Sequence, residues 1–141
     1  MICRDANSNL NYGLGIGVVV DGVNAQLIVK GKVTFNSNVS FGMYSYLFSD
    51  SKLDIAVLND STLNLEQNRY GFYANVFGGA ELNVEVKENG TFETCGNIDY
   101  DVVGYVVGAA TFSGTGYICD QNKVVFNGDG TVDEPVCQDC S

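Results

Sequence analysis

The chain has 141 residues and a net charge of −10, with seven Lys and Arg against 17 Asp and Glu and no His. Nucleic-acid binding requires clustered basic side chains that displace counterions from phosphates, so this charge balance argues against a nucleic-acid partner. No apolar run approaches the roughly 20 residues of a membrane-spanning helix, so no membrane insertion is expected. Seventeen Gly, a single Pro and 45% hydrophobic residues are typical of one turn-rich β domain with its own core.

The beginning of the chain predicts a cap and not a leader peptide. Residues 1–11 are polar and irregular, and they lack the basic and apolar regions of a signal peptide. A secreted parent protein would therefore carry its leader outside this segment. We expect residues 1–11 to form an N-terminal cap, residues 12–120 to hold the repeats, and residues 121–141 to form a C-terminal cap and an acidic, Cys-containing tail.

The region 12–120 repeats itself about every 29 residues, and its fourth repeat, from about Ile98, is partial. A repeat of this length indicates a structural unit that buries its apolar face only by stacking on copies of itself. The expected columns of stacked side chains are Val19, Leu47, Val76 and Val106; Ala25, Leu53, Leu82 and Phe112; Leu27, Ile55 and Val84; Val29, Val57 and Val86; Thr34, Thr62 and Thr91; and Phe35, Leu63 and Phe92.

Within each repeat the apolar residues alternate with polar ones. This alternation runs through residues 24–29, 52–57 and 81–86, and it is typical of a strand with one buried side. Each repeat adds two further apolar stretches, separated by turns rich in Gly, Asn and Asp. The pattern predicts an all-β fold: a short right-handed parallel β-helix of about four coils, with roughly 29 residues and three strands per coil. An antiparallel sandwich would explain the alternation but not the columns.

The stacked coils resemble the right-handed parallel β-helix superfamily, which includes pectate lyases, polygalacturonases, phage tailspikes and surface adhesins. Residues 33–38 and 78–80 are similar to the FxxN and GGA repeats of bacterial polymorphic surface proteins. The enzymes of the superfamily need clustered aspartates with a His, or an acidic Ca²⁺ cluster with a basic residue, and this chain has no His. We therefore expect a non-catalytic extracellular surface, adhesion or structural module. A fragment of a polysaccharide lyase or hydrolase is a further alternative.

Four tyrosines are candidate binding residues for a glycan or a protein. Tyr44 and Tyr73 share one column, and Tyr46 and Tyr105 share another. We expect strand alternation to turn one of these columns outward. Exposed, stacked tyrosines would offer aromatic area and hydroxyl groups to a partner.

The threonines of one column support an alternative function. Thr34, Thr62 and Thr91 are expected to form an outward row, with one Thr per coil. Regular outward threonines are what ice-binding β-helices present, although Thr also favours strands for its branched carbon. The row predicts an ice-binding face as the alternative to adhesion.

Cysteines and glycosylation signals both indicate an oxidising, extracellular location. We expect two disulfides and one further thiol, in a connectivity that the spacing does not reveal, among Cys3, Cys95, Cys119, Cys137 and Cys140. Acceptor triplets for N-glycosylation begin at Asn38, Asn59 and Asn89, and the last two are expected at equivalent corners of successive coils.

Near the C-terminus, oxygen-bearing side chains alternate at Asn127, Asp129, Thr131 and Asp133. Such alternation is what a structural Ca²⁺ loop uses, and a Gly- and Asp-rich turn would also explain it. No other cofactor is expected. The unpaired strands at either end of a solenoid predict end-to-end self-association unless the caps prevent it.

Overall fold

The computed structural model describes residues 1–4, 7–8, 14–36 and 40–140, without the side chains of Cys3, Asn7, Ser8 and Leu14. The chain is all-β, with 58% of its residues in strands, and the helical structure in the described part is the 3₁₀ turn η1 (Gln121–Lys123). No helix in these ranges is long and apolar enough to cross a membrane.

Three parallel sheets form the walls of a β-solenoid with about 29 residues per turn. Sheet A contains, in spatial order, β1 (Ile2–Arg4), β4 (Asn24–Lys30), β7 (Lys52–Val57), β10 (Glu81–Val86), β13 (Thr111–Gly114) and β16 (Thr131–Val132). Sheet B contains β2 (Asn7–Ser8), β5 (Lys32–Phe35), β8 (Thr62–Asn64), β11 (Thr91–Glu93) and β14 (Tyr117–Ile118). Sheet C contains β3 (Leu14–Asp21), β6 (Phe41–Phe48), β9 (Tyr70–Val76), β12 (Tyr100–Val106) and β15 (Val124–Asn127).

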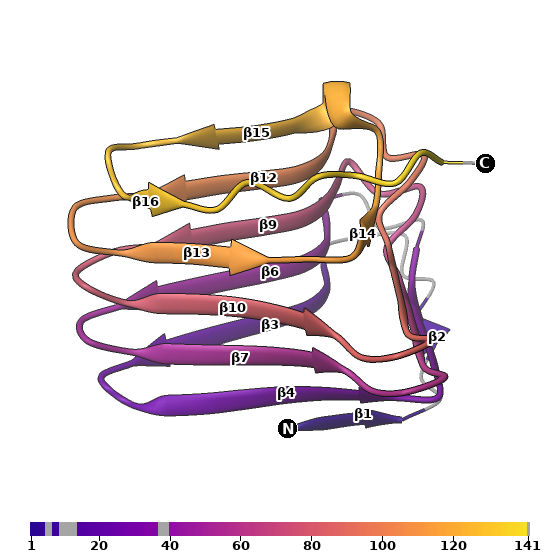
Figure 1. The fold of residues 1–141 in the computed structure, drawn as a ribbon, viewed down its shortest axis with the longest axis horizontal. Helices are drawn as coiled ribbons and strands as arrows, with labels where there is room; N and C mark the ends of the chain where they lie inside the picture. Colours follow the sequence, from indigo (N-terminus) through magenta and orange to yellow (C-terminus); the bar gives the residue numbers. More distant parts are fainter. Residues whose placement is uncertain (5–6, 9–13, 37–39, 141) are drawn as a thin grey trace.

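The chain winds through the three sheets in a fixed order. Figure 1 shows sheet A running from left to right in front and sheet C returning behind it, while the chain climbs from the N-terminus to the C-terminus. This is a right-handed winding, as expected for parallel crossovers. Because every strand pair in the described part of the chain is parallel, the antiparallel sandwich is ruled out.

The predicted register is confirmed in sheet A. Leu53 pairs with Ala25 on one side and with Leu82 on the other, and Leu82 pairs with Phe112. Ile55 likewise lies between the residues equivalent to it in the neighbouring turns. Apolar side chains at equivalent positions of successive turns therefore stack along the solenoid axis and bury one another.

The predicted register is wrong by one residue between β3 and β6. Val20, not Val19, pairs with Leu47, and Val19 pairs with Tyr46. The reason is the length of the next corner, because residues 22–23 connect β3 to β4 whereas residues 49–51 connect β6 to β7. The shift turns Val19 outward, where its side chain is 68% exposed, and buries Val20.

The predicted threonine row is also wrong at its first member. Thr62 pairs with Thr91 as expected, but its other partner is Lys32, and Thr34 pairs with Asn64. Gly31 alone separates β4 from β5, while residues 58–61 separate β7 from β8, so this corner is shorter in the earlier turn. Phe35 is displaced in the same way, since Val33 and not Phe35 pairs with Leu63.

The core fills the space between the three sheets. Its centre holds aromatic rings in edge contact, with Phe92 5.9 Å from Phe72 and 4.8 Å from Tyr117 between ring centroids. All three side chains are fully buried, and burying one such ring stabilises the fold by about 1.5–3 kcal/mol. Gly104 shows how tightly the turns stack, because a Cβ there would overlap the ring of Phe126 in the next turn.

Both expected caps contribute strands to the sheets. The N-terminal segment supplies β1 and β2, which pair with β4 and β5. The C-terminal segment supplies η1, β15 and β16, and its tail then reaches sheet B, where Gln138 pairs with Ile118. The solenoid pattern therefore continues into the described parts of both segments.

Candidate functional site

The outer side of sheet C carries a layer of contacting aromatic rings, which we call the aromatic face. Strands β6 and β9 alternate between buried inner residues and half-buried outer residues. The aromatic face consists of the side chains of Phe41, Tyr44, Tyr46, Phe48, Tyr70, Tyr73, Phe77, Tyr100 and Tyr105.

Both predicted tyrosine columns exist and both lie on this face. Tyr44 pairs with Tyr73, whereas Tyr46 and Tyr105 occupy one column with Asn75 between them. The expectation that only one column would point outward is wrong, because residues two apart on a strand point to the same side. Because both tyrosine columns point outward, the aromatic face is two columns broad instead of one.

The rings stack along the solenoid axis. Tyr44 and Tyr73 lie 5.7 Å apart with an interplanar angle of 18°. Tyr70 and Tyr100 lie 6.3 Å apart at 5°, and Phe41 lies 5.4 Å from Tyr70. Each such pair stabilises the fold by about 0.5–1.5 kcal/mol beyond the effect of its buried area. The rings are therefore held in position by one another in the unbound protein.

Polar atoms are built into this aromatic layer. Asn75 donates a hydrogen bond from Nδ2 to the hydroxyl of Tyr44 over 3.2 Å. Partial burial raises the pKa of Tyr73 above its ordinary value, and the neighbouring Tyr105 adds to the rise. The face thus presents flat apolar rings with neutral hydroxyl and amide groups between them.

The aromatic layer has a gap at its C-terminal side. The column of Tyr44 and Tyr73 continues with Val103 on β12 and Val125 on β15. A depression of ≈ 320 Å³ lies there, lined by Tyr70, Tyr73, Tyr100, Val103, Tyr105, Val125 and Asn127. None of these lining side chains is charged.

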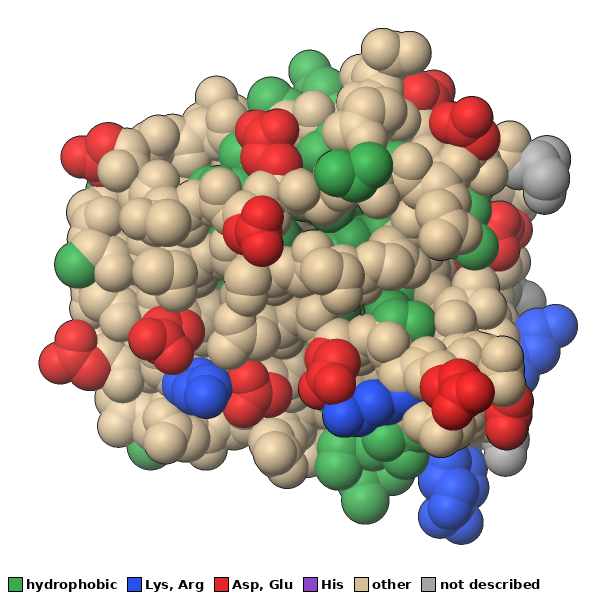
Figure 2. Space-filling view, viewed as in Figure 1, with side chains coloured by type: hydrophobic (Ala, Val, Ile, Leu, Met, Phe, Trp, Pro, Cys, Tyr) green, Lys and Arg blue, Asp and Glu red, His purple; other side chains and the backbone are tan. Residues whose placement is uncertain are grey.

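The outer side of sheet A is polar. Asn83 donates from Nδ2 to Asp54 over 3.2 Å and accepts a hydrogen bond from the hydroxyl of Ser113. Lys87 pairs with Glu85 on the same strand at 2.7 Å. Figure 2 shows acidic and basic side chains spread over this side of the molecule. Asp54 and Asn83 are direct register partners, so this stack joins a carboxylate to an amide.

The outer side of sheet B carries the corrected row of Lys32, Thr62 and Thr91. A charged side chain therefore stands where a third threonine was expected. Farther along these strands, burial and the nearby Glu66 raise the pKa of Glu93 above its usual range.

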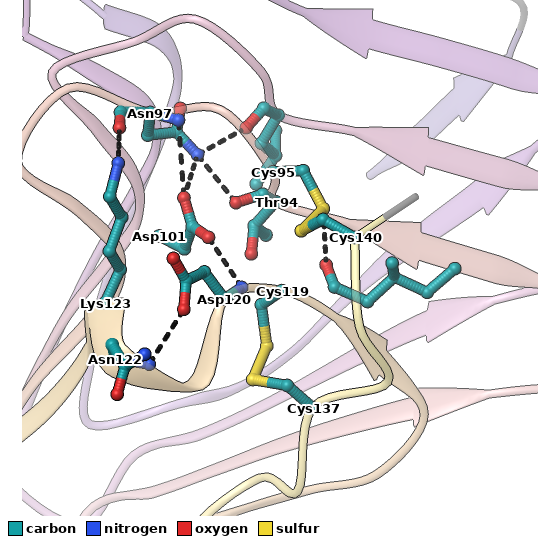
Figure 3. Close-up of a disulfide and its surroundings, with 12 residues drawn as sticks. Thr94, Cys95, Asn97, Asp101, Cys119, Asp120, Asn122, Lys123, Cys137 and Cys140 are labelled. Atoms are coloured by element: carbon teal, nitrogen blue, oxygen red, sulfur yellow. Dashed lines mark hydrogen bonds between the residues drawn. A yellow bond between two sulfur atoms is a disulfide. The ribbon is translucent and has the colours of Figure 1, made fainter.

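A buried polar network lies at the corner between sheets B and C, and the sequence analysis missed it. Asn97 donates from Nδ2 to the backbone oxygens of Leu65 and Thr94 and to Asp101, at 2.8–3.0 Å. Its Oδ1 accepts from the backbone N–H of Asn68, 29 residues earlier. Figure 3 shows Asn97 and Asp101 meeting beside the disulfides. The 29-residue spacing of Asn68 and Asn97 was the signal that could have revealed this network.

Two disulfides join the last turn to the turns before it. Cys95 bonds to Cys140 and Cys119 bonds to Cys137, with Cα atoms 6.0 Å and 5.1 Å apart (Figure 3). The prediction of two bridges is therefore confirmed. The backbone of Cys3 pairs with Val29 in sheet A, and its side chain lies outside the described part of the chain.

Two of the three glycosylation candidates occupy the same corner of successive turns. Asn59 lies between β7 and β8 and Asn89 lies between β10 and β11, and both are exposed. Asn38 lies outside the described residues.

The candidate Ca²⁺ loop is the turn between β15 and β16. Asn127 ends β15, Thr131 begins β16, and Asp133 follows it. Asp129 accepts a hydrogen bond at Oδ1 from the backbone N–H of Gly108 over 2.8 Å, so this carboxylate holds the turn to the previous coil. Among the residues that the structure describes, no group of three or more His, Cys, Asp or Glu is placed to hold a metal ion.

The function of this molecule has to be inferred from its own surfaces. No protein-family model, no curated protein and no solved structure matches the chain significantly. Of the surfaces described above, the aromatic face departs most from an ordinary solvated sheet surface.

Proposed function

We propose that this chain is a non-catalytic extracellular module that binds a glycan or a protein surface through the aromatic face. The observation that carries the proposal is the layer of nine contacting rings on the outer side of sheet C, eight of them on β6, β9 and β12 and the ninth, Phe77, directly after β9. We also propose that the solenoid belongs with the right-handed parallel β-helix superfamily, whose surface proteins have the same architecture.

Physical chemistry favours the aromatic face as the contact surface. Tyrosines have few rotatable bonds, so fixing them against a partner costs little conformational entropy. Their faces match the C–H side of a sugar ring or an apolar protein surface, and their hydroxyls offer hydrogen bonds. The polar, charge-bearing side of sheet A resembles a solvated surface, so we assign binding to sheet C.

The net charge of −10 restricts the charge that a binding partner can carry. Long-range repulsion disfavours polyanions and leaves neutral or basic partners. The two disulfides support an extracellular location, because such bonds persist in oxidising compartments. The lack of His in the sequence argues against the hydrolase branch, which needs one. The lyase branch needs an acidic Ca²⁺ cluster, and the described residues include no group of three or more acidic or other metal-binding side chains placed to hold a metal ion.

Ice binding has less support after the register is known. Its row required three threonines, and Lys32 occupies the place of the first. A charged side chain within the row is poorly suited to an ordered water lattice, so we do not carry this alternative further.

A glycan array with two matched variants tests the proposal. Tyr44→Ala with Tyr73→Ala removes two stacked rings from the aromatic face, and Asp54→Ala removes an outer side chain from sheet A. We expect the array signal to fall about tenfold or more in the tyrosine variant, which corresponds to about 1.4 kcal/mol, and to persist in the Asp54 variant. Wild-type protein that binds no glycan and no cell surface, or variants that bind equally, would contradict the proposal.

A further inference from the structure

The column of Tyr44 and Tyr73 stops one ring short of the columns beside it. On β12 its next member is Val103, whereas Tyr100 and Tyr105 continue the flanking columns on the same strand. The stack of rings therefore ends at Tyr73, and the outer side of Val103 carries no ring. We call this position the missing rung, and the depression of ≈ 320 Å³ lies there.

We propose that this missing rung is a binding site for the ring of a neutral pyranose sugar. The inference rests on the proposed function, which it deepens by naming the ligand class and the position. The bound sugar ring would continue the stack above Tyr73 and replace the absent aromatic side chain.

The lining of the depression matches both sides of a sugar ring. Its floor is apolar, since it is formed by Val103 and by Val125, which follows it in the column. Its rim is polar, because Tyr100 and Tyr105 are 39% and 38% exposed and Asn127 adds an amide. A pyranose likewise has an apolar C–H side and an edge of hydroxyls, so it fits this arrangement better than a wholly apolar ring does.

The charges around the site favour a neutral sugar over an acidic one. No lining side chain is charged. The nearby Arg69 is engaged by Asp99 in an ion pair of 2.7 Å, and its guanidinium lies 5.5 Å from the centre of the Tyr70 ring. A uronic acid would therefore find no charged side chain in the lining to pair with, and it would approach a strongly acidic protein.

A side chain that fills the rung supplies a direct test. Val103→Tyr places a ring where the sugar would bind, and Val19→Tyr is its control. Val19 is 68% exposed and occupies the column of Tyr46 at the other end of sheet C, so the control adds the same ring without closing the depression. Thermal unfolding and far-UV circular dichroism show whether both variants keep the fold. Asn127→Ala supplies a second variant if Val103→Tyr does not fold.

The probes are the methyl glycosides of neutral hexoses and of glucuronic acid, titrated to about 50 mM because single sugars bind shallow sites weakly. Two-dimensional NMR reports shifts at residues 100–105 and 125–127. We expect saturable shifts with a neutral hexoside, about tenfold weaker binding in Val103→Tyr, weaker binding in Asn127→Ala, and no change in Val19→Tyr.

The outcomes separate this inference from the proposed function. If no neutral glycoside shifts these residues, or if Val103→Tyr or Asn127→Ala binds as tightly as the wild type, the missing rung is not the site. Array binding that depends on Tyr44 and Tyr73 would then still support the aromatic face. If a hexoside binds at the rung while no array glycan or cell surface binds, the inference stands and the broader adhesive function fails.

Discussion

Replacement of Asn97 tests the buried corner that joins two successive turns. Asn97→Ala removes the donors to Leu65 O, Thr94 O and Asp101, together with the acceptor for Asn68 N–H. The side chains of Asn68 and Asn97 are 0% and 1% exposed, so water does not readily replace these bonds. Each buried polar group that loses its hydrogen bond costs about 1–3 kcal/mol. Loss of the bonds to Asn68 N–H and Leu65 O alone therefore lowers the free energy of unfolding by about 2–6 kcal/mol.

The assay is urea unfolding followed by far-UV circular dichroism. Asn83→Ala is the matched control, because Asn83 is also an asparagine with side-chain hydrogen bonds to Asp54 and Ser113, but it lies on the outer side of sheet A where water can replace them. We expect the control to cost less than about 1 kcal/mol. Asn97→Asp keeps the volume and places a carboxylate beside Asp101, so it should be at least as destabilising as Asn97→Ala. Equal unfolding free energies for Asn97→Ala and Asn83→Ala would refute the role given to the corner.

Three further predictions address the core, the pH response and the disulfides. Leu53→Ala, at a position that is 0% exposed, should lower the free energy of unfolding by about 2–5 kcal/mol, and a loss below about 1 kcal/mol would argue against its place in the core. Burial and the nearby Glu66 raise the pKa of Glu93 above its ordinary value, so the folded state holds this proton more tightly than the unfolded state does. The resulting stabilisation is full below the unfolded-state pKa and is lost as the pH rises through the folded-state pKa. Glu93→Gln should therefore lose less melting temperature between about pH 4 and pH 7 than the wild type, and identical losses would contradict this. Replacing Cys119 and Cys137 by Ser opens a loop of 18 residues and should lower the free energy of unfolding by about 3 kcal/mol. Reduction of the disulfides should shift size-exclusion profiles toward end-to-end oligomers, and an unchanged profile would show that the ends of the solenoid do not depend on these bonds.

The sequence predicted the sheets where the corners keep a constant length. From β7 to β10 the spacing is 29 residues throughout, and there the pairing of Leu53 with Leu82 and of Ile55 with Val84 is as expected. Column matching by sequence fails where a corner gains or loses residues. A one-residue difference moved Val19 to the outer surface, because a strand alternates sides with every residue. At the next corner the register shifts by two residues, so Thr34 stays on the same side but lies opposite Asn64, and the threonine row is broken without disturbing the core.

The candidate site was predictable in its residues but not in its shape. The shared columns of the tyrosines followed from the repeat, and two-residue spacing alone was enough to place Tyr44 and Tyr46 on one side of β6. The gap at Val103 could not be predicted, because it is defined by the rings of neighbouring strands, and the exact register of β9 and β12 is needed to place Val103 next to Tyr73. The disulfide partners could not be derived, because Cys95 and Cys140 come together through the path of the tail across sheet B.

The central claim is that successive turns lie parallel and in register, and nuclear Overhauser effects between backbone protons test it most directly. The account predicts contacts linking Asp54 with Asn83 and Asn83 with Ser113, and likewise Tyr44 with Tyr73, across strands spaced about 4.8 Å apart. Close Hα–Hα contacts between these strands, which are typical of antiparallel pairs, or an absence of contacts between Leu53 and Leu82, would contradict it.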